Sequence, residues 1–154
     1  MVKVNRKEAE PMKEGYVDNR FASLYYKEMG QGMPLIMLHG NGESHEIFAR
    51  LSELMSRYYR EILMDSRGHG SSLMKEEAAG GDLTIPDMAA DVVQVMEFLH
   101  VPRAVILGFS DGANVALETA SCYPGRVSAV VAVSGNALPR GMSAASLMEV
   151  KLKY

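Results

Sequence analysis

The sequence contains one cysteine, no long apolar run and no basic cluster. The single cysteine, Cys122, excludes an internal disulfide and fits a reducing compartment, so we expect a cytoplasmic protein. No apolar run approaches the roughly 18 residues of a membrane span, and the first eight residues lack the apolar stretch of a signal peptide. A net charge of −3 without a basic run argues against nucleic acid as a partner. These absences predict no membrane and no nucleic-acid contact.

Metal and nucleotide sites also lack their usual patterns. The four histidines show no spacing typical of metal ligands, and no second cysteine accompanies Cys122. Neither a Walker loop nor a Gly-x-Gly-x-x-Gly turn follows an apolar run. We therefore expect no metal and no cofactor. What remains is a chain of 154 residues with 47% hydrophobic composition, long enough for one domain with a buried core.

Short apolar or aromatic runs alternate with longer stretches of helical periodicity. Strands are expected as a pair within 11–29 and at 34–38, 61–64, 104–108 and 127–133, and helices at 45–59, 85–99, 114–121 and 143–153. Thr84 can cap the second helix, with Asp87 three residues later. This alternation predicts an α/β fold with three α/β/α layers and a mostly parallel sheet.

Three glycine-rich loops follow three of the expected strands. They span residues 39–44, 65–72 and 109–112. Since ligands of open α/β sheets bind beyond the carboxyl ends of the strands, these loops should meet at one site.

The loop at 109–112 lies within Gly108-Phe109-Ser110-Asp111-Gly112, preceded by an apolar strand and followed by a helical pattern. Gly-x-Ser-x-Gly in this setting is typical of a nucleophile elbow, a sharp turn that exposes the serine hydroxyl. A side chain at either glycine would crowd the strand against the helix. The alternative is a structural turn in which Ser110 merely caps the helix.

The loop His39-Gly40-Asn41-Gly42 can present backbone N–H groups to a small-molecule substrate. Acyl transfer requires two donors where the oxyanion forms, and we expect the N–H groups of Asn41 and Asp111 to supply them. His39, Gly40, Gly42 and Phe109 are the candidate substrate-binding residues. For the His39 side chain itself, a structural role with hydrogen bonds inside the fold is favoured.

The loop at 65–72 has two interpretations. Arg67 could bind Asp65 or a substrate carboxylate, or the loop could be locked by its own polar groups. His69 is a weak candidate for a general base, because a histidine in a loop more often has a structural or solvated role.

Together the three loops, in this order and spacing, resemble the N-terminal half of the α/β-hydrolase family over about residues 15–135. Within this family, the sequence most resembles the subgroup that carries a helical cap. This subgroup includes esterases, lactonases, carbon–carbon hydrolases and proline iminopeptidases. The resemblance implies Ser110 as the nucleophile and a sheet truncated after about strand six. It also implies a core over 1–135 and the start of a cap over 136–154.

The family's order of catalytic residues is serine, then acid, then histidine. After Ser110 this sequence has no histidine, and its acids are Asp111, Glu118 and Glu149. One hypothesis is a serine hydrolase for an ester-like or other acyl substrate, with its acid and histidine missing here. A second is an inactive binding or self-association module, and a third, minor one has His39 or His69 as the base. The strand at 127–133 would be an exposed apolar edge, which predicts a homo-oligomer.

Overall fold

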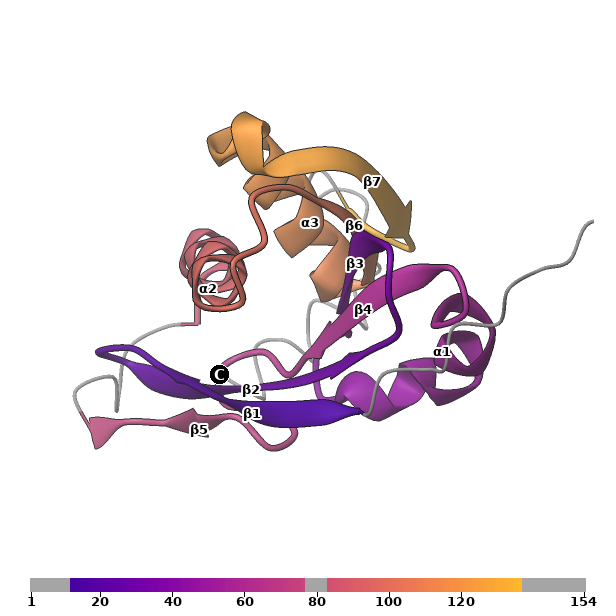
Figure 1. The fold of residues 1–154 in the computed structure, drawn as a ribbon. Coiled ribbons are helices and arrows are strands. Elements are labelled where there is room, and N and C mark those ends of the chain that lie inside the picture. The colour runs from indigo at the N-terminus through magenta and orange to yellow at the C-terminus, as the bar shows by residue number, and fades with distance from the viewer. Residues whose placement is uncertain (1–11, 77–82, 137–154) are drawn as a thin grey trace, which may run out of the picture.

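The computed structural model describes residues 12–76 and 83–136, which form a seven-stranded mixed sheet with helices on both faces (Figure 1). The strands are β1 (Lys13–Asp18), β2 (Ala22–Met29), β3 (Met33–Leu38), β4 (Tyr59–Met64), β5 (Leu73–Met74), β6 (Ala104–Phe109) and β7 (Val127–Val133). The helices are η1 (His45–Phe48), α1 (Ala49–Met55), α2 (Ile85–Phe98), α3 (Asp111–Cys122) and η3 (Pro124–Arg126). The predicted α/β class with a mostly parallel sheet is confirmed.

The strand order β1-β2-β4-β3-β6-β7 places the parallel strands together. Strands β4, β3, β6 and β7 run parallel, whereas β1, β2 and the short β5 pair antiparallel. Leu38 at the end of β3 pairs with both Met64 and Gly108. The carboxyl ends of these three strands therefore meet at one edge of the sheet, as expected for the three glycine-rich loops.

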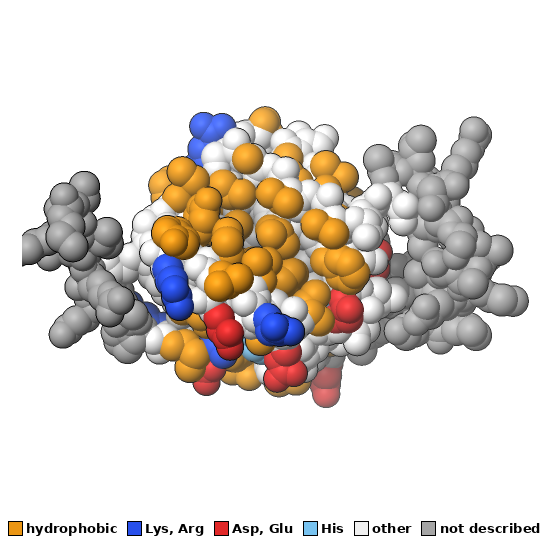
Figure 2. All heavy atoms as spheres, turned by 90° about the vertical axis from the view of Figure 1, so that its right-hand side faces the viewer, with side chains coloured by type: hydrophobic (Ala, Val, Ile, Leu, Met, Phe, Trp, Pro, Cys, Tyr) orange, Lys and Arg blue, Asp and Glu red, His pale blue; other side chains and the backbone are white. Residues whose placement is uncertain are grey.

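The two faces of the sheet are covered unequally. Helices α2 and α3 lie on one face, over a cluster that includes Leu24, Ile36, Ile62, Met96 and Ile106, each fully buried. On the other face α1 packs near β3 and β4 over a second cluster of four buried residues, Leu35, Met37, Phe48 and Leu63. Figure 2 looks onto this second face, where hydrophobic side chains remain at the surface and charges of both signs border them.

The N-terminus of α2 forms as the sequence predicts. The Thr84 side chain accepts a hydrogen bond from the Asp87 backbone N–H, and Thr84 in turn donates to the Asp87 carboxylate. This capping exchange satisfies a backbone donor that the helix leaves without a partner.

The expected helix over 45–59 is correct up to Met55 and wrong in its last turn. The segment starts as η1, continues as α1 and ends at Met55, and Tyr59 already belongs to β4. Phe48, Leu51 and Met55 contact the apolar cluster as predicted, but Tyr58 is 73% exposed. The predicted helix is one turn too long because Tyr58, in the turn before β4, follows Met55 at a helical interval of three residues.

Two other boundaries differ from expectation. Strand β5 was not predicted; it pairs with Ala22 and Ser23 of β2. Helix α3 starts at Asp111, directly after Ser110, rather than at 114. The predicted helix at 143–153 and the cap assignment for 136–154 fall almost wholly outside the described residues. Within the described residues, no helix has the length and apolar character needed to cross a membrane.

Candidate active site

Ser110 joins β6 to α3 in a backbone conformation that L residues rarely adopt, with φ 53° and ψ −118°. Such a strained conformation persists only where the surrounding structure enforces it, and it is common at functional sites. The Ser110 side chain makes no hydrogen bond that caps α3. The alternative of a helix-capping serine therefore does not describe this turn.

The glycines on either side of Ser110 allow the tight junction. A methyl group on Gly112 would lie 2.1 Å from the backbone oxygen of Leu38, and one on Gly108 would lie 2.1 Å from the oxygen of Gly112. Both contacts involve backbone, which cannot move aside easily. The predicted steric need for glycine is confirmed at both positions.

Asp111 is the first residue of α3, so its backbone N–H belongs to the first turn, where helices provide no acceptor of their own. The backbone N–H groups of Ala113 and Asn114 both donate to the backbone carbonyl oxygen of Ser110. The Asp111 amide is thus placed next to Ser110 at the positive end of the helix dipole.

The loop after β3 lies directly against Ser110. A methyl group added to Gly40 would lie 3.0 Å from Ser110 Cβ and 2.7 Å from Glu43 Oε2. Glu43 Oε2 accepts a hydrogen bond of 2.9 Å from the Gly40 backbone N–H, and the Glu43 N–H donates back to the Gly40 oxygen. Glu43 therefore closes the loop beside the serine. Sequence reasoning missed this residue, because a glutamate after a glycine turn has no distinguishing pattern.

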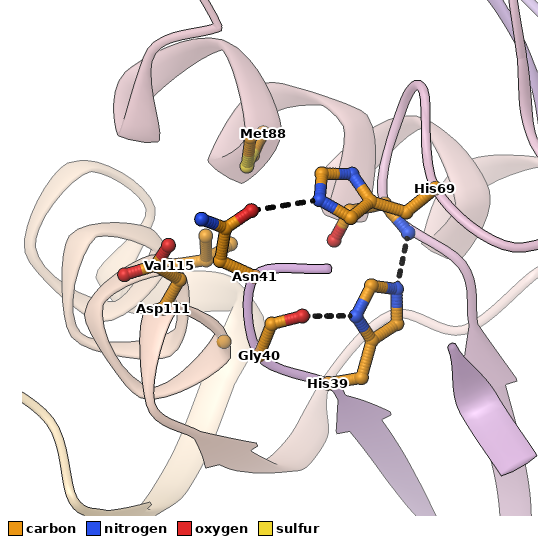
Figure 3. A pocket seen from close by; sticks show the side chains of 9 residues that line it. His39, Gly40, Asn41, His69, Met88, Asp111 and Val115 are labelled. Atoms are coloured by element: carbon orange, nitrogen blue, oxygen red, sulfur yellow. Dashed lines mark hydrogen bonds between the residues drawn. The ribbon is translucent and has the colours of Figure 1, made fainter. Parts of the chain in front are cut away.

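A small pocket lies between this loop, the loop after β4 and the first turns of α2 and α3 (Figure 3). It is lined by His39, Gly40, Asn41, Ser66, His69, Met88, Asp111, Gly112 and Val115. Of the predicted site residues, His39, Gly40, Asn41 and Asp111 line it. Ser110, Gly42 and Phe109 do not, and Phe109 instead packs with the apolar cluster beside α1.

Asn41 and His69 connect the two loops across the pocket. His69 Nε2 lies 3.1 Å from Asn41 Oδ1, and its Nδ1 lies 3.0 Å from the Arg67 oxygen. The Asn41 side chain points toward His69 in Figure 3. Both ring nitrogens of His69 thus face protein oxygens rather than Ser110.

His39 is buried and hydrogen-bonded at both ring nitrogens. Its Nδ1 donates to the Gly40 oxygen at 2.7 Å, and its Nε2 accepts from the Ser66 N–H at 3.0 Å. Burial lowers the pKa of His39, so the imidazole is neutral at physiological pH. These contacts match the structural role favoured for this side chain and leave no nitrogen for Ser110.

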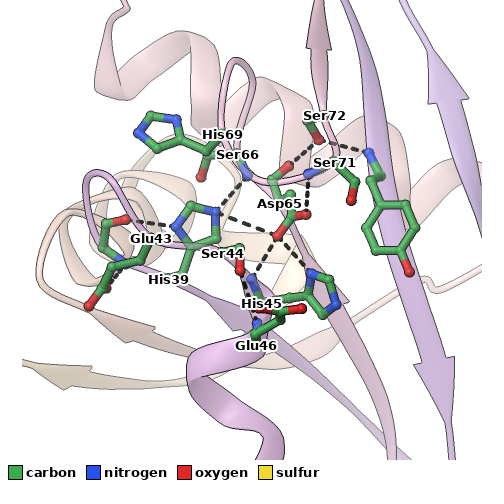
Figure 4. Close-up of polar contacts among 12 residues, drawn as sticks. His39, Glu43, Ser44, His45, Glu46, Asp65, Ser66, His69, Ser71 and Ser72 are labelled. Carbon is green, nitrogen blue, oxygen red and sulfur yellow. Dashed lines mark hydrogen bonds and ion pairs between the residues drawn. The ribbon is translucent and has the colours of Figure 1, made fainter. Parts of the chain in front are cut away.

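Asp65, at the end of β4, is fully buried and surrounded by donors (Figure 4). Its carboxylate accepts hydrogen bonds from the backbone N–H of His45 at 2.6 Å, from His45 Nδ1 at 2.9 Å and from the Ser71 N–H at 2.8 Å. Gly70 has φ 53°, and a methyl group there would collide with the Asp65 carboxylate. The loop at 65–72 is thereby fixed by hydrogen bonds within itself and to His45 at the start of η1.

The suggested pairing of Arg67 with Asp65 is wrong. Arg67 forms a two-pronged pair with Asp91 of α2, with Nε–Oδ2 at 2.6 Å and Nη2–Oδ1 at 2.7 Å. Asn19 donates to the same carboxylate, and Asp91 raises the pKa of Arg67. Burial raises the pKa of Asp91, but the bonds from Arg67 and Asn19 oppose this effect. The pair connects the loop to α2, and the sequence had no signal for a partner 24 residues away.

Among the residues that the structure describes, no group of three or more His, Cys, Asp or Glu side chains could hold a metal ion.

The family model described as alpha/beta hydrolase fold matches residues 33–153. A proline iminopeptidase of Neisseria meningitidis is 30% identical over 128 residues, covering 79% of this chain and 40% of that protein. A pimeloyl-[acyl-carrier protein] methyl ester esterase of Aeromonas salmonicida is 28% identical, covering 74% of this chain and 42% of that protein.

Among solved structures, a putative epoxide hydrolase from Pseudomonas aeruginosa superimposes with a TM-score of 0.73 at 28% identity. The match covers 79% of this chain and 40% of that one. The chain thus spans less than half the length of the curated relatives it matches. The family model covers most of the 154 residues, and the chain belongs to the α/β-hydrolase family.

Proposed function

We propose that Ser110 is the nucleophile of a hydrolase that acts on an ester-like or other acyl substrate. The observation that carries this proposal is the strained backbone of Ser110, together with a side chain that does not cap α3. Strain at a serine between a strand and a helix is the mark of a nucleophile elbow. Relatives named as esterases and as iminopeptidases support a hydrolytic reaction.

In the proposed reaction, Ser110 Oγ attacks the substrate carbonyl carbon while its proton passes to a general base. The carbonyl oxygen becomes an oxyanion, stabilised by the backbone N–H groups of Asp111 and Asn41. Collapse of the tetrahedral intermediate expels the leaving group, which takes up the proton, and leaves an acyl-serine. Water, deprotonated by the same base, then releases the acid and restores Ser110.

The base is proposed to be a histidine from outside these 154 residues, because the family's order places it after the nucleophile. All four histidines of the sequence precede Ser110. The contacts of His39 and His69 argue against the third hypothesis, in which one of them is the base. Replacing His39 by glutamine should leave the reactivity of Ser110 unchanged.

The same contacts favour a second candidate function, a binding module without turnover. A serine hydroxyl without a base is a poor nucleophile at neutral pH. This alternative predicts that a small molecule binds to the pocket and that Ser110→Ala binds it equally well. A turnover that Ser110→Ala abolishes would contradict it.

The test is the intact mass of the protein after incubation with a fluorophosphonate. A single adduct that Ser110→Ala eliminates is expected if the serine is activated. Ser134→Ala is the matched control, since Ser134 also has positive φ (56°) and is exposed. No adduct on folded protein would show that no group within these 154 residues activates Ser110, and it would favour the binding module for this chain.

A further inference from the structure

The two histidines that line the pocket have different sets of hydrogen-bond partners. His39 faces one carbonyl oxygen and one backbone N–H, which suits a neutral imidazole with one protonated and one bare nitrogen. His69 instead faces an oxygen at each ring nitrogen. The Arg67 carbonyl lies 3.0 Å from its Nδ1, and Asn41 Oδ1 lies 3.1 Å from its Nε2. Two acceptors call for two N–H donors, which only the protonated imidazole provides.

The two oxygens around His69 differ in what can replace them. The Arg67 carbonyl only accepts, so the Nδ1 of His69 carries a proton in every state that keeps this hydrogen bond. The Asn41 amide has an oxygen on one side and an NH2 group on the other, and a half-turn about its last bond exchanges them. A protonated Nε2 pairs with the amide oxygen, whereas a bare Nε2 pairs with the NH2 group. The contact therefore survives a change of charge on His69 only if the amide turns over.

Asn41 lines the pocket, so this half-turn changes the group that the pocket presents. The amide nitrogen of Asn41 points away from His69, to the side of the pocket on which Asp111 lies (Figure 3). After the half-turn, the amide oxygen would take its place. The pocket thus presents a hydrogen-bond donor at this position while His69 is charged, and an acceptor once it is neutral.

We propose that Asn41 and His69 form a pH-dependent switch that sets the hydrogen-bonding character of the pocket. The protonated ring holds the amide oxygen and leaves the NH2 group on the side of the pocket. Loss of the proton from Nε2 turns the amide over. A ligand group with an acceptor oxygen is favoured in the first state and a donor group in the second. The switch concerns the Asn41 side chain and does not depend on Ser110 being a nucleophile.

Two of the charged groups near His69 are already neutralised or uncharged. Burial lowers the pKa of His39, and a charge on the His69 ring, whose centroid lies 5.5 Å away, lowers it further. Only one of the two rings is therefore charged at a time. The Arg67 guanidinium is bound by Asp91 of α2, and Asp87 of the same helix accepts a hydrogen bond at the helix N-terminus.

The other groups around the switch are carboxylates. Asp111 of α3 lines the pocket with His69, Asp65 is buried at the end of β4, and Glu43 closes the loop after β3. Negative charge nearby favours the protonated form of a histidine. A carboxylate on the far side of the amide also favours an NH2 group there over an oxygen. Both effects support the orientation of Asn41 seen in the structure.

The test follows the 15N-labelled wild-type chain by NMR from pH 5 to pH 9, a range that includes the one in which histidine ordinarily changes its charge. Long-range 1H–15N spectra report which ring nitrogens carry a proton. We expect both nitrogens of His69 to be protonated at the acidic end and Nδ1 alone at the basic end. A scalar coupling across the hydrogen bond, between Asn41 Nδ2 and His69 Nε2, should appear only in the neutral state.

Asn41→Asp should remove the switch, because a carboxylate accepts a hydrogen bond but cannot donate one. The pH at which Nε2 of His69 loses its proton should rise by at least about one unit. Asn114→Asp is the matched control, since Asn114 lies on α3 outside the pocket lining, and should raise this pH by less than about half a unit. Circular dichroism confirms that both variants are folded, and the wild-type spectra carry the test if they are not.

Three results would overturn the proposal. The first is a His69 ring that keeps one charge state from pH 5 to pH 9. The second is a neutral ring with its proton on Nε2, or one without the coupling to Asn41 Nδ2. The third is a coupling that persists in the charged state, which would show that the amide does not turn over.

Discussion

The two faces of the sheet share their strands but not their environment. Beneath α2 and α3, each buried residue of the larger cluster is at most 7% exposed, and Ile106 is fully buried. On the other face, Leu107 of the same strand is only half-buried. Both faces of β6 are apolar, as in strands that are covered on both sides. Coverage by helices, and not composition, therefore decides how much each side chain contributes to stability.

The two faces also hold different buried acids. Asp91, on the side of α2, has an arginine and an asparagine as partners. Glu61, on the side of α1, is fully buried with Ser52 donating to Oε2, and its Oε1 has no hydrogen-bond partner. Burial raises the pKa of Glu61 above its ordinary value of 4.5. The better covered face thus holds an ion pair, whereas the other face holds an isolated carboxyl group.

The largest effect should come from breaking the ion pair. Asp91→Ala leaves the Arg67 guanidinium buried without a counter-charge, which should lower the free energy of unfolding by about 3–5 kcal/mol. Urea unfolding at neutral pH measures this loss. Replacing both residues by alanine should be less harmful than the sum of the single changes. A loss below about 1 kcal/mol in Asp91→Ala would show that the pair does not matter for stability.

Truncating neighbouring residues of β6 should reveal the unequal coverage directly. Ile106→Ala opens a cavity beneath α2 and α3 and should lower the free energy of unfolding by about 2–5 kcal/mol. Leu107→Ala, on the half-covered face, should lower the free energy of unfolding of the monomer by about 1–2 kcal/mol. The loss is smaller because folding removes less of the Leu107 side chain from water. Equal losses, measured in urea at a concentration where the protein is monomeric, would contradict the contrast between the faces.

Removing the isolated acid should stabilise the protein. Glu61→Gln keeps a partner for Ser52 but cannot ionise, and should raise the free energy of unfolding at pH 7 by about 1–3 kcal/mol. The pKa of Glu61 is raised in the folded state, so the protonated carboxyl group favours the folded protein. This contribution to the free energy of unfolding is fully present below pH 4.5 and is lost as the pH rises through the pKa of Glu61 in the folded state. The difference between variant and wild type should therefore grow from pH 4 to pH 8. A difference independent of pH would refute this explanation.

The smallest effect is expected from adjacent residues of β7. Val130 packs against the larger cluster, whereas Val131 points to the other face of the sheet and is 45% exposed. Val130→Thr places a hydroxyl against apolar side chains and should cost about 1 kcal/mol. Val131→Thr should stay within about 0.5 kcal/mol in the monomer. Thermal unfolding of both variants at low protein concentration provides the measurement, and a larger effect at Val131 would reverse the assignment of the two faces.

Much of the candidate site could be predicted because its signals are local. Strand, elbow and helix around Ser110 are contiguous in the sequence, and the glycines at 108 and 112 report a close approach of backbone. The Arg67–Asp91 pair and the contact between His69 and Asn41 could not be predicted. They join residues 24 and 28 positions apart, whose proximity depends on how α2 and two loops pack.

By itself the sequence determined the α/β alternation, the elbow at Ser110 and the apolar character of β7, because each depends on the properties of neighbouring residues. Only the tertiary structure decided which side of each strand is covered. It also decided that His39 is locked in place, that Glu43 closes the loop beside Ser110 and that Glu61 is buried without a full set of partners. These outcomes depend on contacts between elements, and a linear pattern of residue types does not specify which elements meet.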